Sequence, residues 1–170
     1  MASLSEELKG TMEEEKKGYD DLYSLGQKKR QAVIDRDLAT LTAVTDEEQE
    51  MSDHLKSLEQ KRTRILKDMS SVLGHDDKIL TVTEVIDSLK GQDEEKQALT
   101  EARDELIKSA TNMQFLNQEN KVLLEQAIEM VDFDLTLYKS MRQAPETANY
   151  GRDAENTGDI LGRSGFDFKQ

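Results

Sequence analysis

The stretch from Thr111 to Met141 constrains the fold more than any other part of the chain. It contains no Gly and no Pro, so nothing in it breaks a helix. A helix that packs on one neighbour needs an apolar stripe of roughly 100°, and the apolar residues here spread over several stripes. We therefore expect a long helix that either is buried between several others or keeps a face for a partner. One of its stripes, at seven-residue spacing, consists of Leu116, Leu123, Met130 and Leu137.

The composition favours long paired helices over a compact mixed fold. Of the 170 residues, 35% are hydrophobic, 35% are charged and only 5% are aromatic. The one proline, Pro145, stands after the long stretch, so no residue before it forbids a helix. We predict an all-α fold, namely an elongated antiparallel bundle or hairpin of three long helices with one short extra helix and a flexible C-terminal tail.

The net charge of −13 argues against nucleic acid as a partner, because a nucleic-acid-binding protein needs a basic footprint. Acidic membrane surfaces are disfavoured for the same reason, and no apolar run approaches the ~20 residues of a membrane span. The chain has no Cys and therefore no disulfide framework, and its acidic N-terminus is unlike a signal peptide. We expect a cytoplasmic protein with no membrane span and no nucleic-acid partner.

Helix boundaries in the first half follow from capping residues. Ser3 and Glu6 have the spacing of a capping box, which predicts that the first helix starts at Ser3. A break follows at 35–38, where Asp37 is the candidate N-cap of the second helix. Thr45 repeats the capping-box spacing with Glu48, so a second break there stays open. The second helix then carries a heptad seam that consists of Met51, Leu55, Leu58, Arg62, Ile65, Met69 and Val72.

Three glycines interrupt the first predicted helix at regular intervals, at Gly10, Gly18 and Gly26. Each weakens a helix by about 1 kcal/mol relative to Ala. A glycine also lets another helix approach closely, because it has no Cβ. The sequence leaves open whether these positions serve close packing or are merely tolerated.

The second half has a short helix between two glycines. Gly74 suits the left-handed position that follows a helix end. Thr81 and Glu84 again have capping-box spacing and predict a short helix that Gly91 closes.

The last long helix divides the chain into two predicted parts. Asp93 is its candidate N-cap, and Pro145 disfavours helix before it, so the helix should end near Met141. We predict a helical bundle over residues 1–141 and a flexible, partner-binding tail over residues 142–170, which is rich in Gly, Asn, Asp and Ser.

Nothing in the chain has the spacing of a catalytic site. No Cys/His pair, Ser/His/Asp set or Gly-rich phosphate loop is present, so we do not expect an enzyme. His75 stands beside Asp76 and Asp77, but three adjacent turn residues with no further His nearby are better read as a polar loop than as a metal site. We predict no metal and no cofactor.

The last helix and the segment after it show a characteristic order of features. A Leu-Leu pair lies within NKVLLEQAIEMV, and an apolar helix runs on to Tyr138. A proline break, a Tyr-Gly pair and a terminal Phe-Asp-Phe-Lys follow. This order is similar to that of the FlgN family of flagellar export chaperones, loosely over the whole chain and more specifically from Asn117 to Lys169. The residues that carry the resemblance are Leu123, Leu124, Tyr138, Tyr150, Gly151, Phe166, Asp167, Phe168 and Lys169.

The resemblance implies a cytosolic chaperone of the flagellar type III export system. Such a protein would bind the hook–filament junction proteins FlgK and FlgL before export and hand them to the export apparatus, without nucleotide or metal. It also implies that the C-terminal part of the chaperone holds the client.

We predict that an amphipathic client helix lies along the last long helix, and that the tail folds over the client or is displaced by it. The same helical residues would serve as core if the helix is buried, and both readings stay open. The candidate partner-binding residues are Leu116, Leu123, Met130, Leu137 and Tyr138 on the helix and Tyr150, Phe166 and Phe168 on the tail.

Two other classes of function compete with a chaperone. The heptad seam from Met51 to Val72 permits a structural coiled-coil scaffold, and a homodimer in the absence of client. A regulatory adaptor that binds a transcription factor or a component of a secretion ATPase is the second alternative.

Overall fold

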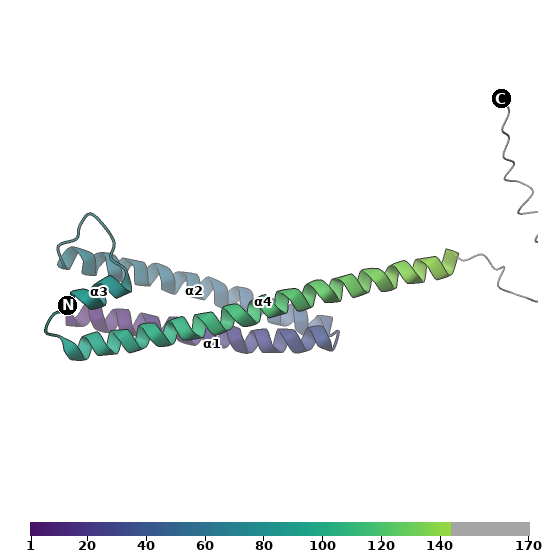
Figure 1. The fold of residues 1–170 in the computed structure, drawn as a ribbon, viewed down its shortest axis with the longest axis horizontal. Coiled ribbons are helices and arrows are strands. Elements are labelled where there is room, and N and C mark those ends of the chain that lie inside the picture. Colours follow the sequence, from purple (N-terminus) through teal and green to yellow (C-terminus); the bar gives the residue numbers. More distant parts are fainter. Residues whose placement is uncertain (144–170) are drawn as a thin grey trace, which may run out of the picture. The chain divides into compact units, whose positions relative to one another are not determined.

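The computed structural model describes residues 1–143, and within them the fold is all-helical, as the sequence predicts, with no strand. Contacts divide the chain into two units, Met1–Ala127 and the part from Ile128 onward, so the last helix contributes to both. The predicted tail lies outside the described residues from residue 144 onward. The helices are α1 (Ala2–Ile34), α2 (Leu38–Val72), α3 (Val82–Ser88) and α4 (Asp93–Gln143) (Figure 1).

Helices α1 and α2 form an antiparallel hairpin around a tight turn (Figure 1). Arg36 occupies the left-handed region at φ 56°, and the Asp37 carboxylate accepts a hydrogen bond from the Thr40 backbone N–H at 3.0 Å. Hydrogen bonds from Thr40 hold the pKa of the Asp37 carboxyl below its ordinary value. The predicted break and its N-cap are therefore confirmed.

The predicted start of the first helix at Ser3 is wrong. Helix α1 begins at Ala2, Met1 is its N-cap, and no side chain caps it. Met1 and Leu4 pack against the hydrophobic core, and the Ser5 N–H donates to the Met1 carbonyl at 2.9 Å. Apolar packing therefore extends the helix past the position at which a serine cap would have started it.

The core of the Met1–Ala127 unit gathers residues from all four helices and from the loop before α3. Leu8 and Met12 of α1, Met69 of α2 and Val85 of α3 are each 0% exposed, so three helices meet at the centre of the cluster. The buried members are Leu8, Met12, Ile65, Leu66, Met69, Leu80, Val85, Ile86, Leu89, Leu99 and Ala102.

Two of the three α1 glycines serve close packing. A Cβ at Gly18 would lie 2.7 Å from the Leu55 Cδ2 atom, and one at Gly26 would lie 2.9 Å from the Leu116 Cδ2 atom. At Gly10 nothing lies within 4 Å of such a Cβ. The close-approach reading is thus right for two positions and the tolerated-glycine reading for one.

An ion pair in the hairpin interior joins α1 to α2. Glu15 is 3% exposed, and Arg62 Nε lies 3.0 Å from its Oε2 atom. Burial raises the pKa of the Glu15 carboxyl above its ordinary value, and the Arg62 guanidinium opposes that shift. A charge buried this deeply is tolerated because its partner reaches it from the neighbouring helix.

The heptad seam of α2 is largely confirmed, and the second break is not. Leu55, Leu58, Ile65 and Met69 are buried, whereas Val72 at the end of the seam is 59% exposed. Helix α2 runs through the region of Thr45, whose hydroxyl donates to the Leu41 carbonyl instead of capping a new helix. Glu48 pairs with Lys29 of α1 at 2.7 Å. The spacing of a capping box is therefore present without its function, because both side chains have other partners.

The connections on either side of α3 follow the sequence. Gly74 and Gly91 adopt φ of 80° and 75°, the left-handed region that glycine favours. Thr81 and Glu84 form the complete capping box at the start of α3. Hydrogen bonds from the Thr81 backbone, Lys78 and the Thr81 hydroxyl lower the pKa of the Glu84 carboxyl to about 2.

Helix α4 differs from the prediction only at its ends. Asp93 is its first residue instead of its N-cap, and the helix ends at Gln143, two residues after the predicted end at Met141. Asp93, Glu94 and Glu95 occupy its first turn, where the helix dipole favours anions. No helix within residues 1–143 is long and apolar enough to cross a membrane.

Candidate partner-binding surface

The seven-residue row of Leu116, Leu123, Met130 and Leu137 passes from a buried to an exposed environment along α4. Leu116 is 6% exposed, Leu123 is half-buried, and Met130 and Leu137 are 57% and 49% exposed. Because the spacing keeps these residues on nearly one face of the helix, the face that packs inside the Met1–Ala127 unit is free further along the chain.

The buried part of this face is fixed by contact with α1. Leu116 fills the space that Gly26 leaves, as described above. Asn120 is 3% exposed, and its side-chain amide donates to the Gly26 carbonyl at 2.7 Å. Of the two roles that the sequence leaves open for this row, the structure confirms the core role for Leu116. Binding of a partner by Leu116 stays a prediction.

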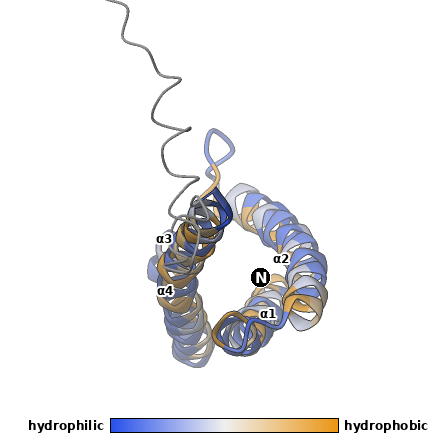
Figure 2. Ribbon diagram, turned by 90° about the vertical axis from the view of Figure 1, so that its right-hand side faces the viewer, coloured by the Kyte–Doolittle hydropathy of each residue, from blue (hydrophilic) through white to orange (hydrophobic). Residues whose placement is uncertain are grey.

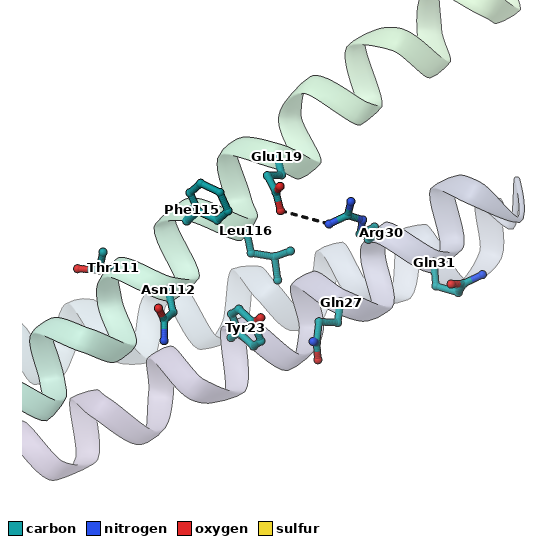
Figure 3. A pocket seen from close by; sticks show the side chains of 9 residues that line it. All are labelled: Tyr23, Gln27, Arg30, Gln31, Thr111, Asn112, Phe115, Leu116 and Glu119. Atoms are coloured by element: carbon teal, nitrogen blue, oxygen red, sulfur yellow. Dashed lines mark hydrogen bonds and ion pairs between the residues drawn. The ribbon is translucent and has the colours of Figure 1, made fainter.

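A groove of about 620 Å³ lies beside this contact, between α1 and α4 of the Met1–Ala127 unit (Figure 3). Phe115 and Tyr23 expose 68% and 36% of their surfaces there. Arg30 donates to the Glu119 carboxylate at 3.2 Å and bridges the two helices, and since both side chains are exposed the pair adds little stability. The groove is lined by Tyr23, Gln27, Arg30, Gln31, Thr111, Asn112, Phe115, Leu116 and Glu119.

From Ile128 to Gln143 every residue of α4 is exposed. Single exposed apolar residues are common on proteins, but a contiguous group of large ones marks an interaction surface. Figure 2 shows hydrophobic positions recurring between hydrophilic ones along α4. We call the following set the exposed α4 face: Ile128, Met130, Val131, Phe133, Leu135, Leu137, Tyr138 and Met141, each at least 49% exposed.

The chemistry available on this surface is that of binding. Thioethers, aliphatic chains and aromatic rings can bury area against a partner helix, and methionine adapts to its shape. Arg142 lies over the Tyr138 ring, 5.6 Å from its centroid. Within residues 1–143 no group of three or more His, Asp or Glu side chains is placed to hold a metal ion.

The structure brings together only some of the sequence-predicted site residues. Met130, Leu137 and Tyr138 share the exposed α4 face, whereas Leu116 lies in the helix packing. Tyr150, Phe166 and Phe168 lie outside the described residues, so their role stays a prediction.

Sequence reasoning missed several exposed residues as candidates. Ile128, Phe133 and Leu135 belong to the several apolar stripes of the long helix, but the sequence alone assigns none of them to a site. Their signal was the breadth of that arc, which exceeds what one neighbouring helix covers. Phe115 of the groove had the same signal, and Tyr23 had none, because only the fold brings α1 beside α4.

Comparison with families of known proteins decides the assignment. The family described as FlgN protein matches residues 1–158, nearly the whole chain. The chain belongs to the FlgN family. FlgN proteins are chaperones of flagellar export, which gives this chain its general role in flagellum assembly. Searches of curated proteins and of solved structures gave no match.

Proposed function

We propose that this FlgN-family chain is a cytoplasmic chaperone that binds FlgK and FlgL before their export and delivers them to the flagellar export apparatus. The observation that carries the proposal is the exposed α4 face. An amphipathic client helix laid on this face would be shielded from premature association, and the chaperone would need neither cofactor nor metal.

The size of the apolar side chains supports binding of useful strength. Burying one large aliphatic or aromatic side chain contributes about 1.5–3 kcal/mol, so a few such contacts can offset the entropic cost of association. The face spreads over roughly two-thirds of the helix circumference at about 100° per residue, which suits coverage by more than one client helix.

The test is calorimetric titration of the full chain with purified FlgK and, separately, FlgL. Met130→Asp combined with Leu137→Asp should weaken binding by roughly 100-fold or more, because tenfold in affinity corresponds to 1.4 kcal/mol. Helicity and melting should stay unchanged, since both residues are exposed.

The control is Thr136→Asp, and it is compared with the single variant Met130→Asp because each adds one carboxylate. The residues one turn away from Thr136 are Asp132, Phe133, Lys139 and Ser140, so three of its four neighbours are polar or charged. Binding should stay within about threefold of wild type. Equal loss in both variants would assign the effect to charge alone and contradict a specific apolar contact.

Truncation after Met141 separates the contribution of the tail from that of the helix. Retained binding would place the site on α4, and lost binding would assign client capture to the tail. Absence of binding to either protein, together with a concentration-dependent dimer that Met130→Asp dissolves, would favour the coiled-coil scaffold over the chaperone.

A further inference from the structure

Asp134 stands in the middle of the exposed α4 face. The residues three and four positions away, which are its neighbours on the helix surface, are Met130, Val131, Leu137 and Tyr138. These four are 49–57% exposed, and Asp134 is exposed among them. A helix covering the face would therefore cover this carboxylate as well.

No cation of the helix is placed to neutralise Asp134. None of its four helical neighbours is basic, and no ion pair among residues 1–143 includes it. The carboxylate of Glu129 has different surroundings: the residues one turn away are Glu125, Gln126, Asp132 and Phe133, and of these only Phe133 belongs to the exposed α4 face.

The packed part of the same helix contains a polar residue on the same side as Asp134. Asn120 lies two seven-residue steps before Asp134. It is buried, and its side-chain amide donates a hydrogen bond to the Gly26 carbonyl at 2.7 Å. A carboxylate is far more expensive to bury than an amide, and it needs a charged partner with good geometry.

We propose that Asp134 is a specificity-determining residue, which selects client helices that carry a Lys or Arg within their apolar stripe. The inference rests on the proposed function and adds the chemistry of the partner to it. Arginine would suit the site best, because its guanidinium can bind a carboxylate through two parallel hydrogen bonds. The net charge of −13 also favours a locally basic helix. A purely apolar client helix would leave the carboxylate buried and unpaired, and would be rejected.

The experiment compares Asp134→Lys with Glu129→Lys in calorimetric titrations of the full chain against FlgK and FlgL. Both variants change the charge by the same amount on exposed helix positions. We expect Asp134→Lys to weaken binding by roughly 30-fold, in the range typical of a broken interfacial ion pair, and Glu129→Lys by less than about threefold. A single Lys→Glu or Arg→Glu exchange in the client helix should restore at least tenfold of the lost affinity with Asp134→Lys alone.

Two results would overturn the inference. Wild-type affinity of Asp134→Lys, or tighter binding of Asp134→Leu, would show that no cation faces the carboxylate. If Met130→Asp with Leu137→Asp still abolishes binding in that case, only the role of Asp134 fails. If neither FlgK nor FlgL binds the wild-type chain, the proposed function fails and the inference with it.

Discussion

Residues 93–127 and residues 128–141 of α4 carry apolar side chains of the same kind, in the same seven-residue rows, but only the first segment buries any of them. In the first segment Leu99, Ala102 and Leu116 are buried against the rest of the Met1–Ala127 unit. In the second segment every residue is exposed. An apolar stripe in the sequence therefore predicts a helix face that can be buried, and only the folded structure shows which part of that face is already buried.

The largest contrast should appear when one leucine is truncated in each segment. Leu99→Ala should lower the free energy of unfolding by about 2–5 kcal/mol, because Leu99 is 1% exposed and its loss leaves a cavity. Leu137→Ala should change it by less than about 0.5 kcal/mol. Urea unfolding followed by circular dichroism measures both, and equal losses would show that Leu137 is covered in solution.

Close packing in the Met1–Ala127 unit predicts the next effect. Gly18→Val should destabilise the fold by about 1–3 kcal/mol, since the added Cβ would lie 2.7 Å from Leu55 Cδ2. Gly10→Val is the control and should stay within about 0.5 kcal/mol, because the space around Gly10 is open. The same urea experiment applies, and a tolerated Gly18→Val would mean that α1 and α2 pack less tightly than described.

A smaller difference in stability is expected between variants of Asn120 and Asp134, two polar residues that lie two seven-residue steps apart on α4. Asn120→Ala should lower the free energy of unfolding by about 1 kcal/mol through loss of the hydrogen bond to Gly26. Asp134→Ala should leave it unchanged, because Asp134 is exposed on the helix. Thermal melts of the two variants measure both changes in stability. A larger drop in melting temperature for Asp134→Ala than for Asn120→Ala would contradict this expectation.

The smallest expected effect is local to α3 and depends on pH. The pKa of Glu84 is lowered to about 2 in the folded chain, so its stabilising contribution is complete above about pH 4.5 and is lost as the pH falls toward 2. Backbone amide signals of Thr81 and its neighbours, followed by NMR, should shift over that range. Glu84→Gln should remove the shift, and a transition near pH 4.5 in the wild type would contradict the capping geometry.

Most of the fold could be predicted from local signals. The hairpin turn at Asp37, the helix stop at Gly74 and the capping box at Thr81 depend on residues close together in the sequence, where the chemistry is decisive. The start of α1 could not, because Met1 and Leu4 extend the helix by packing on a core formed by distant residues. The false break at Thr45 has the same origin, since Glu48 is occupied by Lys29 of α1.

The candidate surface was less predictable than the fold. Periodicity places Leu116 and Met130 in one row but cannot tell which of them has a neighbour. The neighbour of Leu116 is Gly26, ninety positions earlier in the chain, and its effect is invisible in a local pattern. Exposure in the folded structure separates the two residues and moves the candidate site toward residues 128–141.

Hydrogen–deuterium exchange of the full chain with and without purified FlgK locates the client on the chaperone. Binding of FlgK to the exposed α4 face should slow exchange strongly over residues 128–141 and leave residues 99–116 nearly unchanged, since the latter are already packed. Slowed exchange confined to the Met1–Ala127 unit, with residues 128–141 exchanging as in the free chain, would contradict a client site on the exposed α4 face.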